Sequence, residues 1–240
     1  MNAVKINLTI FFLFFLSILP LRIINLMAHL AGYLLYTTSN SLRNITKINL
    51  QICFPYKTEK EIQILTRNSL IESSKNFFES GKCWITYPRI GINKIIEVEG
   101  KELVLNSLEE GNGVILFTPH IGNIEVLINY LAENFNCTIP YTPVKIPSLD
   151  ILVKKARETM GAKMVTASSS GVKALFVSLK KGGLIVIASD QVPREENGLI
   201  SKFFGTQALT VSLVSGVAVR TKSVCHSVCC IRLGTGMWFK

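Results

Sequence analysis

Acidic residues are scarce in this chain of 240 residues: 16 Asp and Glu stand against 26 Lys and Arg, giving a formal net charge of +10. Such an imbalance predicts an anionic partner, such as nucleic acid, phospholipid headgroups or an acidic protein. The sequence contains no RRM, KH or zinc-finger pattern, which makes nucleic acid the least favoured of the three. We therefore expect a membrane surface or an acidic protein as partner, and no nucleic acid.

Internal repeats, low-complexity segments and convincing linkers are also missing. The length suits one substantial hydrophobic core, and 48% of the residues are apolar while only 18% are charged. The sequence predicts two parts: a membrane anchor with its juxtamembrane segment over residues 1–36, and one folded domain over residues 37–240.

Charge is absent from residues 6–21, INLTIFFLFFLSILPL, which lie between Lys5 and Arg22. As a helix this stretch rises about 24 Å, short of a hydrocarbon core of about 30 Å. Snorkelling of the flanking bases, or continuation of the helix into residues 23–36, would make up the difference. A cleavable signal peptide is the alternative, but no small-x-small cleavage site follows Pro20. Since more cationic residues follow the span than precede it, we expect a retained anchor with a cytoplasmic domain.

Paired metal-ligand motifs are lacking too. Cys53, Cys83 and Cys137 stand singly in apolar surroundings, as reduced core cysteines usually do. The run CHSVCC at residues 225–230 looks like a metal cluster, but it lies in a strand-like stretch without a second ligand pair at zinc-finger spacing. We expect no metal site.

Helical and strand-like stretches alternate after the anchor. Thr58 and Glu61 form a capping box that opens a helix reaching about Phe78. Strands are expected at residues 95–98, 114–118, 137–141, 162–166 and 183–189, and helices at 123–134, 149–160, 168–179 and 209–220. Uninterrupted apolar strands separated by helices are typical of a mostly parallel central sheet with helices on both faces, an α/β fold.

Two titratable residues come directly after strong strand signals. His120 follows VILFT at residues 114–118, and Asp190 follows GLIVIAS at 183–189. Parallel sheets bind ligands beyond the carboxyl ends of their strands, so both side chains should emerge at the same edge if the two strands are parallel. The sequence therefore predicts a functional site at this edge.

Glu125 follows His120 by five residues, which would place the two side chains about 140° apart within one helix. They can meet only if His120 lies in the turn before the helix, with Gly122 in the turn and Asn123 as the N-cap. Glu125 would then bond one ring nitrogen, and the other would take a proton from an incoming hydroxyl, assistance worth about 10²–10⁴ in rate. A loop histidine that only caps the strand end is the alternative, and spacing alone does not decide between them.

A serine nucleophile elbow is absent, because the run SSSG at residues 168–171 lacks the leading glycine. Direct attack by an incoming hydroxyl therefore fits better than a covalent serine intermediate. Eight Lys and Arg lie between Lys145 and Lys181, against Asp150 and Glu158. Among these bases, Arg157 either grips a phosphate through its planar fork or belongs to a solvated helix face.

Taken in order, these residues resemble the late-acting lipid A biosynthesis acyltransferases, the lauroyl and myristoyl transferases, within the lysophospholipid acyltransferase-like superfamily. The likeness covers nearly the whole chain from the apolar N-terminus onward. Its motifs are RNI at 43–45, NLQICFP at 49–55, TPHIGNIE at 118–125, YTP at 141–143, Arg157, DQ at 190–191 and FFG at 203–205. The ordered set is far more specific than any one of its members.

The resemblance implies transfer of a fatty acyl chain from acyl carrier protein to a hydroxyl of a Kdo-bearing lipid A precursor, in lipopolysaccharide biosynthesis at the bacterial inner membrane. It implies no metal and no cofactor beyond the acyl donor. His120 would be the general base and Glu125 its partner. Arg157 would bind phosphate or stabilise the oxyanion, and Asp190 would position Arg157 or substrate. The expected substrate-binding residues are Asn123, Tyr141, Gln191, Lys154 and Lys155.

The chain departs from the family pattern at several positions. Thr142 replaces the usual arginine between Tyr and Pro, and Lys202 replaces a proline. The chain also ends tens of residues earlier than such proteins usually do, so we expect an acyltransferase domain with a shortened C-terminus. Three alternatives stay open: acyl transfer to a lysophospholipid or other glycolipid, a membrane-bound thioesterase, and a non-catalytic binder of carrier protein.

Overall fold

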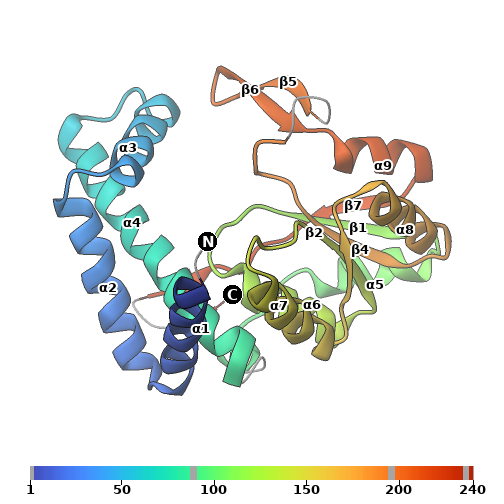
Figure 1. The fold of residues 1–240 in the computed structure, drawn as a ribbon. Coiled ribbons are helices and arrows are strands. Elements are labelled where there is room, and N and C mark those ends of the chain that lie inside the picture. Colours follow the sequence, from blue (N-terminus) through green and yellow to red (C-terminus); the bar gives the residue numbers. More distant parts are fainter. Residues whose placement is uncertain (1–2, 87–90, 194–197, 235–237, 240) are drawn as a thin grey trace.

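The structure is a computed structural model that describes residues 3–86, 91–193, 198–234 and 238–239. Figure 1 shows an arm of N-terminal helices beside a second part built around a twisted sheet. The strands of this sheet are β1 (Val114–Thr118), β2 (Cys137–Tyr141), β3 (Lys163–Thr166), β4 (Leu184–Ala188) and β7 (Val224–Ser227). They lie in the order β3-β2-β4-β1-β7, and every neighbouring pair is parallel. The predicted parallel sheet is confirmed.

The register of the sheet aligns the carboxyl ends of its two central strands. Thr118 at the end of β1 lies opposite Ala188 at the end of β4. The residues that follow β1 and β4 therefore leave the sheet at the same edge, as the sequence predicts.

Helices cover both faces of the sheet, and alternate residues of each strand explain why. Leu116 and Val186 point into a core shared with α6, whereas Ile115 and Ile185 point into a core shared with α8 and α9. One face carries α5 (Lys101–Glu109) and α6 (Ile124–Asn134), and the other α8 (Ser169–Lys180) and α9 (Leu213–Thr221). Strands buried on both sides read as continuous apolar runs, which is the pattern that predicted them.

The arm consists of α1 (Ala3–Ile18), α2 (Leu21–Thr37), α3 (Ser41–Cys53) and α4 (Glu59–Gly81). The predicted capping box at Thr58 and Glu61 is confirmed at the start of α4. At the α2–α4 contact the helices approach so closely that a Cβ on Gly32 would lie 2.5 Å from the Ile71 Cα.

The N-terminal apolar segment is divided, because α1 ends at Ile18 and α2 begins after Pro20. Continuation of one helix from residues 6–21 into 23–36, one of the two ways considered to reach the needed length, is therefore interrupted, since proline lacks the N–H of a helix interior. Of the helices that the structure describes, none combines the length and apolar character that a membrane-spanning helix needs.

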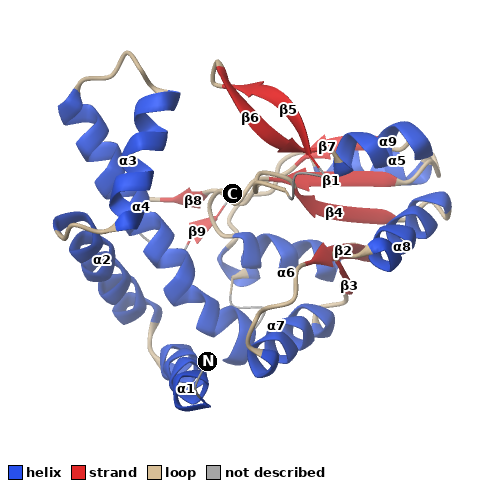
Figure 2. Cartoon of the chain, turned by 45° about the horizontal axis from the view of Figure 1, so that its top comes forward, coloured by secondary structure: helices blue, strands red, loops and turns tan. Residues whose placement is uncertain are grey.

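Two predicted elements differ from the structure. Residues 95–98 do not form a strand, and a 3-10 turn, η3 (Ile92–Lys94), precedes them. The helix expected over 209–220 begins only at Leu213, because residues 206–211 pair in a hairpin instead. That hairpin joins β5 (Gly198–Phe203) to β6 (Thr206–Val211) through Phe204 and Gly205, both at positive φ (Figure 2).

The remaining elements connect these parts. A π-helical turn, η1 (Lys82–Thr86), extends α4, and α7 (Pro147–Thr159) packs beside α6. Near the C-terminus β8 (Arg232–Leu233) and β9 (Trp238–Phe239) form a short antiparallel pair. The ring of Phe54, just after α3, lies 5.9 Å from that of Phe204 and joins the arm to the hairpin tip.

Candidate active site

His120 and Asp190 meet at the carboxyl edge of the sheet. The His120 backbone N–H donates to Asp190 Oδ2 at 2.8 Å, and the ring Nδ1 lies 2.6 Å from Oδ1. The two residues are 70 positions apart in the chain and are brought together because β1 and β4 are parallel neighbours. Their shared position at this edge, which the sequence predicts, is confirmed.

The Asp190 carboxylate determines which nitrogen of the neutral His120 ring carries the proton. Burial alone would raise the pKa of Asp190, but hydrogen bonds from the His120 backbone and ring outweigh burial and lower that pKa. An ionised carboxylate can only accept, so Nδ1 of the neutral ring carries the proton and Nε2 holds the lone pair. The His120 side chain is 39% exposed, and Gln191 places its amide nitrogen 3.5 Å from Nε2. This arrangement suits a general base.

Glu125 does not bond to His120, which corrects the expected pairing. Its carboxylate accepts from Arg157 Nη2 at 2.6 Å and from Arg157 Nε at 3.1 Å, with both side chains largely buried. Gly122 turns the chain between the two residues, and Glu125 lies in the first turn of α6, where α7 supplies the arginine. Asp190 bonds to His120, so of its two expected roles, positioning Arg157 or positioning substrate, only the second stays a prediction.

Asn123 caps α6, as predicted. Its Oδ1 accepts from the backbone N–H groups of Glu125 and Val126 at 3.1 and 3.2 Å. Its Nδ2 donates to Glu79 Oε2 at 2.7 Å, and the residue is only 2% exposed. The amide is thus buried and engaged at both ends within the protein, which replaces the expected contact with substrate.

Of the other expected substrate-binding residues, Gln191 and Tyr141 lie at the same edge. Gln191 adjoins the His120 ring. Tyr141 ends β2, and burial, followed by the nearby Asp150 carboxylate, raises the pKa of its phenol. Lys154 and Lys155 lie on α7, where Lys154 faces Glu158 at 3.8 Å. Their contact with substrate stays a prediction.

Sequence reasoning missed a buried ionic cluster beneath the site. Glu79, which is fully buried, accepts from two nitrogens of Arg232 at 2.7 Å each, in addition to Asn123. Glu72, Asn76 and Glu79 lie on one face of α4 at helical spacing, which is the only signal that the sequence offers. Their partner Arg232 lies 153 residues beyond Glu79 and has no local pattern.

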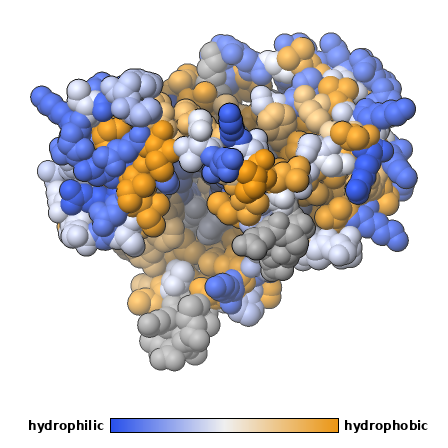
Figure 3. Space-filling view, turned by 90° about the horizontal axis from the view of Figure 1, so that it is seen from above, coloured by the Kyte–Doolittle hydropathy of each residue, from blue (hydrophilic) through white to orange (hydrophobic). Residues whose placement is uncertain are grey.

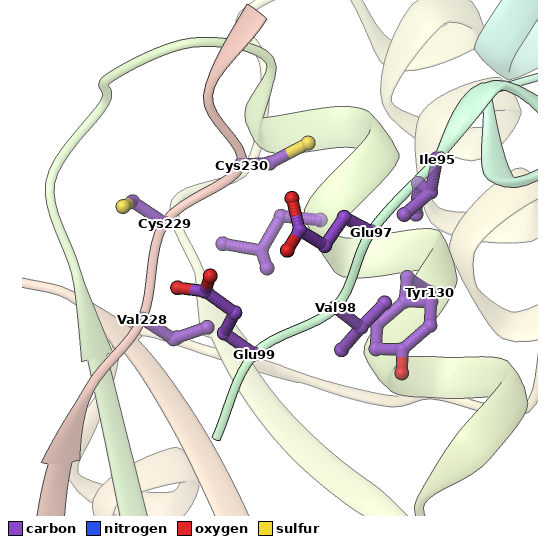
Figure 4. Close-up of a pocket in the computed structure, with 9 residues that line it drawn as sticks. Ile95, Glu97, Val98, Glu99, Tyr130, Val228, Cys229 and Cys230 are labelled. Carbon is purple, nitrogen blue, oxygen red and sulfur yellow. The ribbon is translucent and has the colours of Figure 1, made fainter. Parts of the chain in front are cut away.

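Two recesses open between α6, the segment that runs from Ile95 into α5, and β7 with the residues that follow it. The smaller, of about 80 Å³, has Glu97 and Glu99 on one side and Cys229 and Cys230 on the other (Figure 4). Burial raises the pKa of the Cys230 thiol to about 12, which makes this thiol a poor nucleophile. The larger recess, of about 370 Å³, contains His226, whose Nε2 lies 2.9 Å from Ser107 Oγ. Neither is lined by a predicted catalytic residue.

Seen from above, the molecule has a hollow between the helical arm and the part that carries the sheet (Figure 3). Apolar side chains flank it on both sides. A wide opening of this kind suits a large amphipathic substrate better than a small polar one.

Residues 2–240 match the family described as "Bacterial lipid A biosynthesis acyltransferase". The chain is 27% identical over 218 residues to a lipid A biosynthesis acyltransferase of Haemophilus influenzae, which covers 90% of this chain and 68% of the relative. It is 22% identical over 181 residues to the lipid A biosynthesis lauroyltransferase of Escherichia coli, a match that covers 74% of this chain and 57% of that relative. It is also 22% identical over 177 residues to lipid A biosynthesis acyltransferase 2 of Shigella flexneri, a match that covers 73% of this chain and 56% of that relative.

The chain therefore spans between about half and two thirds of the length of these curated relatives. The match over almost the whole chain confirms the resemblance noted in the sequence, and these relatives are named as enzymes that transfer acyl groups. The chain belongs to the bacterial lipid A biosynthesis acyltransferase family.

Proposed function

We propose that this protein transfers a fatty acyl chain from acyl carrier protein to a hydroxyl of a Kdo-bearing lipid A precursor. The observation that carries the proposal is the His120 ring, which Asp190 holds through Nδ1 at the carboxyl edge of the sheet. Family membership supports the reaction class, and the basic net charge of +10 suits both an acidic carrier protein and a phosphorylated glycolipid.

In the proposed reaction His120 Nε2 takes the proton of the acceptor hydroxyl as its oxygen attacks the thioester carbonyl. A carbon–oxygen bond forms, the carbon–sulfur bond breaks, and the departing sulfur takes the proton back from the imidazolium. Asp190 holds the required tautomer and stabilises the imidazolium while it exists. No covalent acyl-enzyme is needed, because the acceptor oxygen is itself the nucleophile.

Glu125 takes a different part from the one that its spacing suggested. Its two carboxylate oxygens accept from Nε and Nη2 along one edge of the Arg157 guanidinium, which fixes the direction of the remaining N–H groups. We assign these N–H groups to a substrate phosphate or to the oxyanion that forms during attack. Glu125 is then a positioning residue for Arg157.

Exposed apolar side chains of the arm support a location at a membrane surface, and the cationic residues that follow the N-terminal apolar segment favour the cytoplasmic side of the inner membrane. In α3, Leu42, Ile45, Ile48 and Ile52 are each at least 44% exposed and recur every three or four residues. An apolar stripe of this kind, on a helix that also bears Arg43 and Lys47, suits a membrane surface. We propose that residues 6–21 anchor the protein and that the arm rests on the lipid.

Hydrolysis is the second candidate, because the exposed His120 ring would equally activate a water molecule. The deciding experiment incubates the protein with a mixed pool of acyl carrier protein thioesters, with and without a tetraacylated, Kdo-bearing precursor. Mass spectrometry then measures both products. A precursor that gains one acyl chain supports the transferase, whereas free fatty acid formed at the same rate without acceptor supports the thioesterase and contradicts our proposal.

A further inference from the structure

The mechanism makes no use of the buried carboxylate of Glu79, which lies within α4 and is fully shielded from solvent. Three N–H groups converge on it: Nη1 and Nη2 of Arg232, and Nδ2 of Asn123, each at 2.7 Å. A carboxylate without solvent is tolerable only when it is paired and hydrogen-bonded, and Glu79 meets both conditions.

Arg232 ties the C-terminal segment to the arm. Besides Glu79 it donates from Nε to Glu72 Oε2 at 3.0 Å and from Nη2 to Asn76 Oδ1 at 3.2 Å. Burial alone would lower the pKa of Arg232, but the hydrogen bonds and charges of Glu79 and Glu72 outweigh burial and raise that pKa. The guanidinium is therefore a permanent cation held against one face of α4.

The Asn123 amide has only one workable orientation in these surroundings. Its oxygen must face the N–H groups of Glu125 and Val126, and its nitrogen must face the Glu79 carboxylate. A flipped amide would set oxygen against carboxylate and N–H against N–H. Glu79 therefore selects the orientation in which Asn123 caps the helix that carries Glu125.

A backbone hydrogen bond also holds the loop that contains Asn123. The Asn123 N–H donates to the Cys230 carbonyl at 3.1 Å, two residues before Arg232. Gly122, at φ +64°, lies so close that a Cβ there would overlap the same carbonyl oxygen. The loop from His120 to Asn123 is thus held between α4 and the segment that carries Arg232.

We propose that Glu79 and Arg232 are positioning residues that act through Asn123 to hold His120 and Glu125 in register for acyl transfer. This inference rests on the proposed function, but the geometry that it describes can be measured without it. The test uses the full chain in detergent, with Glu79→Gln, Asn123→Ser, the double variant and the unaltered protein.

Asn123→Ser isolates the link to Glu79, because serine caps a helix about as well as asparagine but is too short to replace the amide bridge. Asn40→Ser is the matched control, since Asn40 caps α3 by accepting from the Arg43 N–H and lies outside the cluster. Two measurements are made on each variant: kcat and KM for acyl transfer, and hydrogen exchange of the Glu125 and Val126 amides.

We expect Glu79→Gln to speed exchange of these two amides at least tenfold while β1 stays protected, and to lower kcat by about 10²-fold with little change in KM. Asn123→Ser should lower kcat similarly, and the double variant should be no slower than Asn123→Ser alone, because both changes break one link. Asn40→Ser should leave kcat unchanged.

Multiplicative losses of kcat in the double variant, or unchanged exchange of both amides in Glu79→Gln, would overturn the inference. If Glu79→Gln does not fold, Asn123→Ser decides by its own kcat, and a normal value refutes a positioning role. If the unaltered protein transfers no acyl chain, the proposed function fails, and the exchange measurement still decides whether Glu79 holds the loop.

Discussion

The imidazole Nδ1 of His120 lies 2.6 Å from Oδ1 of Asp190, and the same aspartate accepts the His120 backbone N–H through its other oxygen. One carboxylate therefore fixes both the position and the tautomer of the ring. Glu125, which we expected to pair with His120, holds Arg157 instead. In the proposed mechanism the His120–Asp190 pair handles the proton, and the Glu125–Arg157 pair binds negative charge.

Asp190→Asn should lower kcat by about 10²–10⁴-fold with a much smaller change in KM. The amide can donate to Nδ1, which would favour the wrong tautomer and leave Nε2 protonated. Acyl transfer measured under saturating donor tests this expectation. Glu110→Gln, an exposed change at the end of α5, should keep normal turnover. A kcat near normal for Asp190→Asn would refute the assigned role.

The lowered pKa of Asp190 predicts a specific loss of stability in acid. A carboxyl group whose pKa is lower in the folded state stabilises the fold above its unfolded pKa, about 3.9 for Asp, and loses that contribution as the pH falls through the folded pKa. The free energy of unfolding should therefore drop more steeply below pH ~4 in the unaltered protein than in Asp190→Asn. Urea unfolding at a series of pH values measures the free energy of unfolding of both proteins. If that free energy falls equally with pH in the two, the Asp190 carboxylate is not stabilised by His120.

Glu125 and Arg157 should be strongly coupled, because both side chains are largely buried. Glu125→Gln or Arg157→Gln alone should lower the free energy of unfolding by about 3 kcal/mol, since each leaves an unpaired buried charge. The double variant should lose less than the sum of the two. The exposed Lys154–Glu158 pair is the control, and Glu158→Gln should cost less than about 1 kcal/mol. Additive losses at Glu125 and Arg157 would contradict the coupling.

Gly122 and Gly111 form a natural pair of test positions. Both have positive φ, but a Cβ on Gly122 would overlap the Cys230 carbonyl oxygen, while none of the surrounding atoms described lies within 4 Å of one on Gly111. Gly111→Ala should cost about 1–2 kcal/mol for the left-handed backbone alone. Gly122→Ala should cost at least twice as much and lower kcat, because the His120 loop must move. Equal losses in urea unfolding would show that the close approach does not matter.

Much of the sheet could be predicted because its strands are buried on both faces. VILFT and LIVIA are continuous apolar runs, and their parallel pairing follows from the helices between them. The meeting of His120 and Asp190 at one edge is then a consequence of topology. The β5–β6 hairpin was missed because its exposed strands lack that pattern and its turn uses Phe204 in a left-handed conformation.

Partners chosen across long stretches of chain could not be predicted. Spacing suggested that Glu125 faces His120, but an arginine 32 residues away on α7 holds its carboxylate. Arg232 likewise reaches Glu79 from a segment without a distinctive pattern. Sequence periodicity reports which face of an element is buried, whereas the choice among several charged partners depends on how the elements pack.

The most direct test of the account is the rate at which His120→Ala adds an acyl chain to a Kdo-bearing lipid A precursor, compared with the unaltered protein. Acyl carrier protein thioester is the donor, and mass spectrometry follows the acylated product. We predict product from the unaltered protein and a loss of at least about 10²-fold in His120→Ala, with melting temperature unchanged within a few degrees. Equal rates in the two proteins would contradict general-base catalysis by His120.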